Sequence, residues 1–441
     1  MSARGEGGGA MRIGTDSAAA TRQRLAVGTA SSPAQDAATR TLHDWMRAHE
    51  SELIAFLQRL VDIDSATELR EGVETVARLM ETTMRDMGFA VRRVETPPPP
   101  EPWIYDAFMA DRGQAGIAPA VECRLGGGTG RGRLLMMGHI DTAFPVGSPT
   151  VNPFCIDRAT NRAFGPAVAD MKGGDAGIVF ACRALVETGV ARPEQICVIF
   201  DTDEQGGSVR SRPLIEAEAR QSDWGMVTEA GRVGGEVVGQ RAGIAIGELI
   251  IEGVEAHLGT GFRTGRSAIE AMCRKVIALH KLHDPDNGVL LNVGEFNGGT
   301  RRNLYAGKCV ARMDIRCVDH AAWERTKAAI EAIAAADDLP GTTTTLKLWQ
   351  HRPPMPWTSE TRAMAKLVAD IGAALGTSID TIATMGASDA NIIASQGVPT
   401  LCGLGPVGGA IMTRDEYIEL PSLVERATLV AALAHRLSMA G

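Results

Sequence analysis

The stretch that decides the fold is RGRLLMMGHIDTAFP, residues 131–145. Its apolar run, Leu134–Met137, has the length of a strand that is buried on both faces, as strands of parallel sheets are. Directly after this run come His139 and Asp141, two side chains that suit a metal ion better than an apolar core. We therefore expect a buried sheet whose strand ends carry polar chemistry.

Several further segments resemble this strand or alternate with it. Helical spacing of apolar residues is seen from about residue 42 to 60, in EGVETVARLMETTMRDMGF (71–89) and in GGDAGIVFACRALVETG (173–189). Strand-like runs are QICVIFDTD (195–203), SDWGMVTEA (222–230) and GVPTLCGL (397–404). Strands that alternate with helices predict an α/β domain with a mainly parallel sheet.

The chain of 441 residues is too long for one compact core, so we expect two domains. The pattern changes near residue 240, where two long β-like runs, 241–257 and 307–318, alternate with helical segments at 266–283 and 320–336. We expect a disordered tail over 1–38 and a catalytic domain over 39–240 and 351–441. An α+β domain is then inserted over 241–350.

Composition limits the partners of the protein. The net charge of −8 and the absence of a basic stripe argue against nucleic acid. No apolar stretch approaches the about 20 residues that span a bilayer, so we expect no membrane partner. The eight cysteines include no CxxC pair, which is typical of reduced thiols in a cytoplasmic protein.

Acids and one histidine stand at the expected strand ends or in a loop beside them. They are His139, Asp141, Asp170, Asp201, Asp203, Glu204 and Glu229. The carboxyl ends of parallel strands form the ligand-binding edge of an open α/β sheet. One imidazole and two carboxylates can hold a divalent ion and leave a position for water. Such an ion acidifies its water, and a nearby carboxylate removes the proton, so this set predicts metal-assisted hydrolysis.

Motifs along the chain identify a family resemblance. In order they are GHIDTAFP, GPAVADMKGG, TDEQGGS, VTEAG, EAHLGT, GRSAIEA, GGTRRN and GASDAN. Together they resemble the M20 metallopeptidase family, which includes glutamate carboxypeptidase, acetylornithine deacetylase and succinyl-diaminopimelate desuccinylase. The resemblance implies a metal-dependent catalytic α/β domain with an inserted α+β lid that serves for dimerisation. We therefore expect a homodimer or a higher homo-oligomer.

The resemblance also implies a role for each matching residue of the metal centre. His139 and Glu229 would bind the same metal ion. Asp170 would be the carboxylate that bridges two ions in typical members, and Asp141 would orient His139. Glu204 would be the general base.

In the lid, the resemblance gives His257 as the histidine that reaches the active site of a neighbouring subunit. Asn303 matches a residue that holds a substrate oxygen. Arg301, in the same motif, would bind the carboxylate or nitro group of an anionic small-molecule substrate. Arg210 and Arg212, after the base loop, are further candidates for this contact.

Two positions depart from the family pattern. Gln205 stands where a second glutamate would bind the second metal, and Met412 stands where a histidine would bind it. A neutral amide binds hard metals weakly and a thioether suits soft ions. We therefore expect one divalent ion, Mn²⁺ or Zn²⁺, with Gln205 and Met412 lining the substrate pocket.

Three functions fit this pattern. The first is hydrolytic deamination of an aromatic amine with an electron-withdrawing group, such as 5-nitroanthranilate, with release of ammonia. The second is an M20-type carboxypeptidase or an amidohydrolase of N-acyl amino acids. The third is a binding protein without catalysis, against which the retained Glu204 argues.

Overall fold

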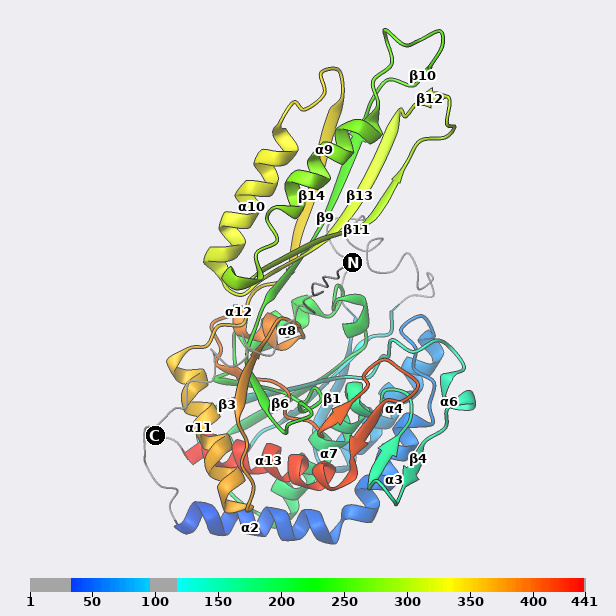
Figure 1. Ribbon diagram of the computed structural model, residues 1–441. Coiled ribbons are helices and arrows are strands. Elements are labelled where there is room, and N and C mark those ends of the chain that lie inside the picture. Colours follow the sequence, from blue (N-terminus) through cyan, green and yellow to red (C-terminus); the bar gives the residue numbers. More distant parts are fainter. Residues whose placement is uncertain (1–32, 96–116, 440–441) are drawn as a thin grey trace, which may run out of the picture.

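The computed structural model of the protein describes residues 33–95 and 117–439. Figure 1 shows a large α/β assembly of strands and helices and, projecting from it, a smaller sheet with two helices on one face. The first described helix begins at Pro33, within the segment expected as a tail, and residues 1–32 lie outside the described part. Among the described residues, no helix is both long enough and apolar enough to cross a bilayer.

The larger assembly is built on a six-stranded sheet of order β1-β2-β6-β3-β7-β16. Strands β3, β6, β7 and β16 are parallel, whereas β1 and β2 form an antiparallel edge. The strands are β1 (Ala90–Val94), β2 (Ala120–Leu125), β3 (Arg133–His139), β6 (Gln195–Asp201), β7 (Trp224–Val227) and β16 (Thr400–Leu401). The predicted mainly parallel α/β sheet is confirmed.

Helices cover both faces of this sheet, which explains the apolar run in β3. Leu134 and Met136 join the core on one face, and Leu135 and Met137 join the core on the other. The first core includes residues of α2 (Pro33–Ala48), α3 (Glu50–Val61), α4 (Arg70–Asp86), α7 (Gly173–Thr188), α11 (Ser359–Ala374) and α13 (Leu420–Met439). The second includes residues of α8 (Arg212–Ala219) and α12 (Ala390–Ser395). Because both faces are buried, period-2 polarity is absent from the strand.

Short elements complete the larger assembly. One four-stranded sheet joins β4 (Cys155–Asp157), β5 (Arg162–Phe164), β17 (Gly408–Gly409) and β18 (Tyr417–Glu419). A separate parallel pair joins β8 (Val237–Arg241) and β15 (Thr381–Thr384). The other short elements are α6 (Ser148–Val151), η1 (Val168–Lys172) and η2 (Glu204–Gly206).

The projecting part, which we call the lid, contains an antiparallel sheet of order β11-β13-β9-β14. Its strands are β9 (Gly243–Glu252), β11 (Val289–Gly298), β13 (Lys308–Cys317) and β14 (Thr343–Arg352). Helices α9 (Ala268–His280) and α10 (His320–Ala335) pack on one face of it (Figure 1). The short pair β10 (Ala256–His257) and β12 (Leu304–Tyr305) lies at the far end of the lid, and η3 (Pro285–Asn287) precedes β11.

The chain enters the lid through β9 and leaves it through β14, and these two strands pair with each other. Below them, the backbones of Arg241 and Met355 bond to each other in both directions. The Asn391 amide donates to the carbonyl oxygens of Ala242 and Pro353, at 3.0 and 2.8 Å. One side chain therefore holds both segments that connect the lid to the larger assembly, residues 241–243 and 352–355. We call these two segments the hinge.

The packing of α7 against the sheet gives a first prediction. A β-carbon placed at Gly174 would lie 1.9 Å from the carbonyl oxygen of Thr228, whereas one at Gly177 would meet nothing within 4 Å. We expect Gly174→Ala to lower the free energy of unfolding by about 1–3 kcal/mol. Gly177→Ala, on the same helix, is the control and is expected to be neutral or to stabilise by about 0.5–1 kcal/mol. Urea denaturation of both variants checks this, and equal midpoints would contradict the close packing.

Candidate metal centre

Three strand-end or loop segments bring three metal-ligating side chains together. His139 is the last residue of β3, Glu229 follows β7, and Asp170 lies in the irregular turn η1 that leads into α7. One ligating atom from each of these residues lies within 4.8 Å of those of the others. The His139 Nε2 atom is 3.2 Å from Asp170 Oδ1 and 4.0 Å from Glu229 Oε1.

This donor set fits one divalent ion. It offers one imidazole nitrogen and two carboxylate oxygens, as open catalytic sites do. His139 is only 1% exposed and Asp170 8%, so the charges are held away from solvent. A bound cation would balance one buried and one half-buried carboxylate, Asp170 and Glu229, that otherwise depend on His139 alone in this cluster.

Asp141 supports both the imidazole and the next loop. The His139 Nδ1 atom lies 3.0 Å from the Asp141 carbonyl oxygen and 3.5 Å from the Asp141 carboxylate. The same carboxylate accepts bonds from the backbone N–H groups of Glu204 and Gln205, both at 3.1 Å, and from the Thr67 hydroxyl at 2.8 Å. Asp141 therefore fixes the orientation of His139 and the start of η2 together.

Burial and charge shift the acid–base properties of these groups. Burial lowers the pKa of His139, but bonds to Asp141 and Asp170 outweigh it and hold that pKa well above its usual range. Burial raises the pKa of Glu229. For Asp170, burial is opposed by the bond to His139, and the pKa is lowered. The cluster is thus arranged to keep Asp170 ionised.

Glu204 begins η2 beside this cluster. Burial raises the pKa of Glu204 to about 8, against the opposing charge of Arg352. The Arg352 Nη2 atom donates to Glu204 Oε1 at 2.7 Å. A carboxyl with a pKa near neutrality suits proton transfer.

The Gln205 side chain is directed to Asp170, one of the three candidate ligands. Its Nε2 atom donates to Asp170 Oδ2 at 3.2 Å, whereas Asp170 Oδ1 is the atom nearest His139. An amide N–H is a hydrogen-bond donor and not a metal ligand. One oxygen of Asp170 therefore faces the three-ligand cluster and the other is engaged by Gln205.

Met412 is linked to the site by a hydrogen bond of its backbone. Its side chain is 55% exposed, and its N–H donates to Glu416 Oε2 at 2.8 Å. The other Glu416 oxygen accepts from the N–H groups of Ala169 and Asp170, at 2.9 and 3.1 Å. His435, the last histidine, contacts the Ala191 carbonyl oxygen at 2.8 Å and is not part of the three-ligand cluster.

The predicted lid residues lie near one another but apart from the metal ligands of their own chain. His257 pairs with Leu304, and the N–H of Leu258 donates to the Asn303 carbonyl oxygen at 2.9 Å. Arg301 accepts a backbone bond from Leu304 at 3.1 Å. This group belongs to the far end of the lid, around β10 and β12 in Figure 1.

Other strand-end candidates have structural surroundings. Asp203 accepts bonds from the N–H groups of Arg210 and Ser211, at 2.7 and 3.2 Å, so it organises the loop after η2. Arg212 donates to the His351 carbonyl oxygen at 2.6 Å and pairs with Glu216 at 2.7 Å. These contacts engage the Nε and Nη1 atoms of Arg212 within the protein.

A second group, Glu122, Cys197 and Glu218, also has ligand atoms close enough for an ion. Arg124 pairs with both carboxylates, with 2.6 Å to Glu218. Arg92 contacts Glu122 as well. Because these two cations already balance the two acids, this group resembles a structural ion-pair network more than a metal centre.

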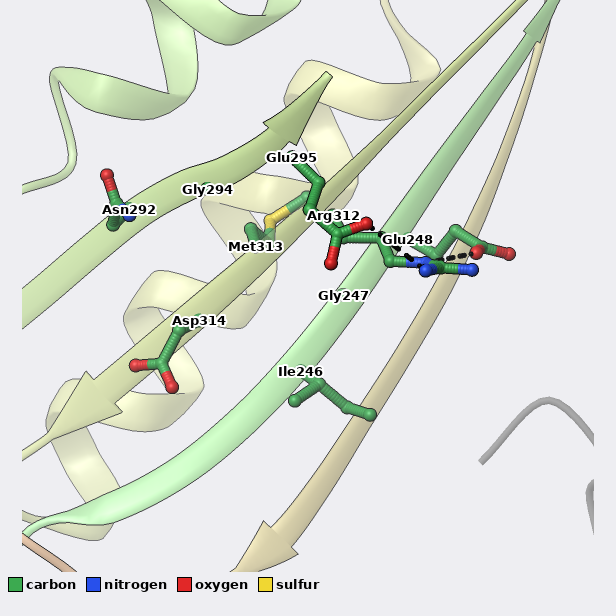
Figure 2. Close-up of a pocket in the computed structure, with 9 residues that line it drawn as sticks. All are labelled: Ile246, Gly247, Glu248, Asn292, Gly294, Glu295, Arg312, Met313 and Asp314. Atoms are coloured by element: carbon green, nitrogen blue, oxygen red, sulfur yellow. Dashed lines mark hydrogen bonds and ion pairs between the residues drawn. The ribbon is translucent and has the colours of Figure 1, made fainter. Parts of the chain in front are cut away.

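A hollow of about 220 Å³ lies on the lid sheet and is lined by residues of β9, β11 and β13. Figure 2 shows the side chains that line it. Arg312 crosses it and pairs with Glu248 at 3.0 Å and with Glu295 at 3.2 Å. No predicted site residue lines this hollow. Its central guanidinium already has two acidic partners, so the hollow is not a strong candidate for an anionic ligand.

Sequence reasoning missed Arg352 and Asp389. Arg352 pairs with Asp389 at 2.5 Å as well as with Glu204. The available signal was weak, namely an arginine directly before Pro353 where the chain re-enters the larger assembly, and an acid inside the motif GASDAN.

Comparison with known proteins agrees with this geometry. The model of Peptidase family M20/M25/M40 matches residues 135–436, and the chain belongs to this family. The protein is therefore a metal-dependent hydrolase that acts on C–N bonds. Carboxypeptidase G2 of Pseudomonas sp. (strain RS-16) is 27% identical over 384 residues, which are 86% of this chain and 88% of that relative.

Solved structures share the fold. A tripeptidase from Staphylococcus aureus subsp. aureus Mu50 matches with a TM-score of 0.70 at 21% identity. The match covers 89% of this chain and 99% of the tripeptidase chain. A dinuclear metal-binding M20 peptidase from Bacillus subtilis has a TM-score of 0.62 at 16% identity, with coverages of 89% and 99%. The expected M20 membership and α/β fold are thus confirmed.

The double role of Asp141 gives a second prediction. We expect Asp141→Asn to weaken Mn²⁺ binding by about 10–100-fold, because supporting groups of this kind orient a metal ligand. Titration calorimetry measures the change. Asp157→Asn at the end of β4, where the carboxylate accepts bonds from Ala159 and Thr160, is the control and should bind Mn²⁺ as the unaltered protein does. Unchanged affinity in Asp141→Asn would contradict the orienting role.

Proposed function

We propose that the protein is a single-metal hydrolase in which His139, Asp170 and Glu229 hold one Mn²⁺ or Zn²⁺. The observation that carries this proposal is the hydrogen bond from Gln205 Nε2 to Asp170 Oδ2. In a two-metal centre a bridging carboxylate gives one oxygen to each ion. Here the second oxygen is engaged by a neutral donor.

The chemistry of the second position supports the same proposal. Neither the Gln205 amide nor the Met412 thioether is a good ligand for a hard divalent ion. The side chain of Met412 is also more than half exposed. The set that would hold one ion is complete, and the set that would hold another lacks two ligands.

The residues of the chain divide the reaction between them. A divalent ion held by the three ligands would supply Lewis acidity and lower the pKa of a bound water from about 15.7 toward about 7. Glu204, as a carboxylate, takes the proton from the attacking water and delivers it to the leaving nitrogen. Asp141 holds His139 and the backbone of Glu204 in fixed relation during both transfers.

The substrate that best fits one ion is an aromatic amine activated by an electron-withdrawing group, such as 5-nitroanthranilate. A second ion would help to hold the negative charge that develops on the substrate. Without it, a nitro-substituted ring can accept that charge itself. Water then replaces the amino group, the carbon–nitrogen bond breaks and ammonia leaves.

Hydrolysis of an N-acyl amino acid or a peptide C-terminus is the second candidate. The similarity to carboxypeptidase G2 along 86% of the chain favours it. The same three ligands and Glu204 would serve this reaction, in which an amino acid leaves in place of ammonia.

We further propose that a second copy of the chain completes the site. His257, Asn303 and Arg301 gather at the far end of the lid, which is where a dimeric arrangement would make them available to a neighbour. Arg301 would there meet the anionic group of the substrate.

The metal count gives a third prediction. After dialysis against Mn²⁺, elemental analysis should give about one ion per chain, and His139→Ala should lose it. The double variant Gln205→Glu/Met412→His supplies a carboxylate and an imidazole at these two positions and should bind about two ions. A count of about two in the unaltered protein would overturn the single-metal proposal.

The released product gives a fourth prediction. With 5-nitroanthranilate we expect ammonia, and with N-benzoyl-L-glutamate little free glutamate. The opposite pattern would favour the second candidate. Glu204→Gln should lower kcat by about 10²–10⁴-fold, as the loss of a general base does, while Mn²⁺ binding is retained. If that variant kept full activity, Glu204 would not be the base.

A further inference from the structure

A buried arginine connects the proposed base to the hinge of the lid. Arg352 is the last residue of β14 and is 3% exposed. Its Nη2 atom lies 2.7 Å from Glu204 Oε1, 3.2 Å from the Glu204 carbonyl oxygen and 3.1 Å from the Ser208 hydroxyl. Its Nη1 atom lies 2.5 Å from Asp389. The guanidinium therefore holds the side chain and the backbone of Glu204 at once.

The position of Arg352 in the chain makes this contact unusual. In β14 the register with β9 shifts between Gln350 and Arg352, so the strand becomes irregular where it leaves the lid. A β-carbon placed at Gly243 would lie 2.9 Å from the Arg352 carbonyl oxygen and 2.7 Å from the Pro354 nitrogen. The two crossing segments are thus in backbone contact at Arg352. Rotation of the lid about the hinge must move the backbone that carries this guanidinium.

The surroundings of Arg352 are strongly acidic. Glu204, Asp389 and Asp201 all act on its charge. Asp389 and Asp201 are buried, and Glu204 is half-buried. Ser208 also donates to Asp389. Arg352, Ser208, Glu204 and Asp389 therefore form one hydrogen-bonded network. Buried acids that share a cation depend on its exact placement, because desolvation makes an uncompensated charge costly.

We infer that Arg352 is a positioning residue of the reaction, which aligns the Glu204 carboxylate and couples its alignment to the hinge of the lid. This inference rests on the proposed role of Glu204 as general base. Arg352 reaches the chemistry through Glu204 and touches none of the three metal ligands in the contacts described above.

Removal of Arg352 should also change the pH dependence. The charged groups that act on Glu204 are Arg352 from β14, His139 from β3, Asp389 at the start of α12 and Glu229 after β7. Arg352 favours the ionised carboxylate, whereas the two acids oppose it. His139 is neutral when it binds the metal ion, so it adds no charge of its own in the loaded protein. Loss of Arg352 leaves the acids less compensated, so the Glu204 pKa rises and the acid limb of kcat/KM moves to higher pH.

The test compares Arg352→Met and Arg352→Lys in the full-length, Mn²⁺-loaded protein. The substrate is whichever of 5-nitroanthranilate and N-benzoyl-L-glutamate is turned over. We expect Arg352→Met to lower kcat about 10–100-fold with little change in KM, and to shift the acid limb upward. Arg352→Lys retains the charge and should recover part of kcat and most of the pH profile. Arg312→Met on the lid sheet also removes an arginine that pairs with two acids and is the control.

Several outcomes would overturn the inference. The first is that Arg352→Met has the same pH profile and kcat as Arg312→Met. The second is that only KM rises in Arg352→Met, which would make Arg352 a substrate-binding residue. Glu204→Gln separates the two levels of the proposal. If Glu204→Gln stays active, the proposed function fails. If it is inactive while Arg352→Met behaves normally, only the inference fails.

A measurement without substrate decides the case in which neither compound is turned over. Hydrogen–deuterium exchange reports the order of residues 203–211, whose backbone includes Glu204. We expect residues 203–211 to exchange faster in Arg352→Met than in Arg312→Met. Strand β13 should exchange in Arg352→Met as it does in the unaltered protein. Equal exchange of residues 203–211 in both variants would overturn the inference.

Discussion

The structure depends on keeping several carboxylates out of water within a few ångströms of one another. The parallel strands β3, β6 and β7 end at the same edge, so their polar ends converge whether or not the charges suit one another. Burial alone would drive such acids to the protonated form. The chain compensates with His139 for the ligand set and with Arg352 for the base loop. A divalent cation would add the remaining positive charge.

Much of this arrangement follows from sequence pattern. A four-residue apolar run that ends in a glycine and a histidine predicts a doubly covered strand with a polar end, and β3 has that form. Strand ends in a parallel sheet share an edge, which grouped His139 and Glu229 with several other acids. Asp170 lies in a loop, and it was the resemblance to the M20 family that singled out these three residues as ligands. The position of Arg352 could not be predicted in this way. It comes from a strand of the lid, and its contact with Glu204 spans 148 residues of sequence, for which no local periodicity gives a signal.

Gln205 has an amide NH₂ group where a glutamate has a carboxylate oxygen, and this difference changes which partner the side chain can bind. Glutamate and glutamine have nearly the same shape, so the loop η2 and its bonds to Asp141 suit either side chain. The glutamine amide donates a hydrogen bond to a negatively charged acceptor, whereas a glutamate carboxylate at this position would bind a cation. Sequence reasoning predicted a weakened second metal site from this substitution. The structure adds that the amide donates to Asp170 Oδ2, whereas Asp170 Oδ1 lies nearest to His139.

The lid has a further mechanical consequence. Strands β9 and β14 each run for ten residues from the hinge into the body of the lid, and both belong to one sheet backed by α9 and α10. A sheet that is backed by two helices is stiffer than its strands alone, so a rotation at the hinge would move it largely as one body. A small rotation at Gly243 and Arg352 would therefore give its largest displacement at β10 and β12, which lie at the opposite end of the lid (Figure 1). Side chains at that end would then travel much farther than the groups beside Gly243 and Arg352.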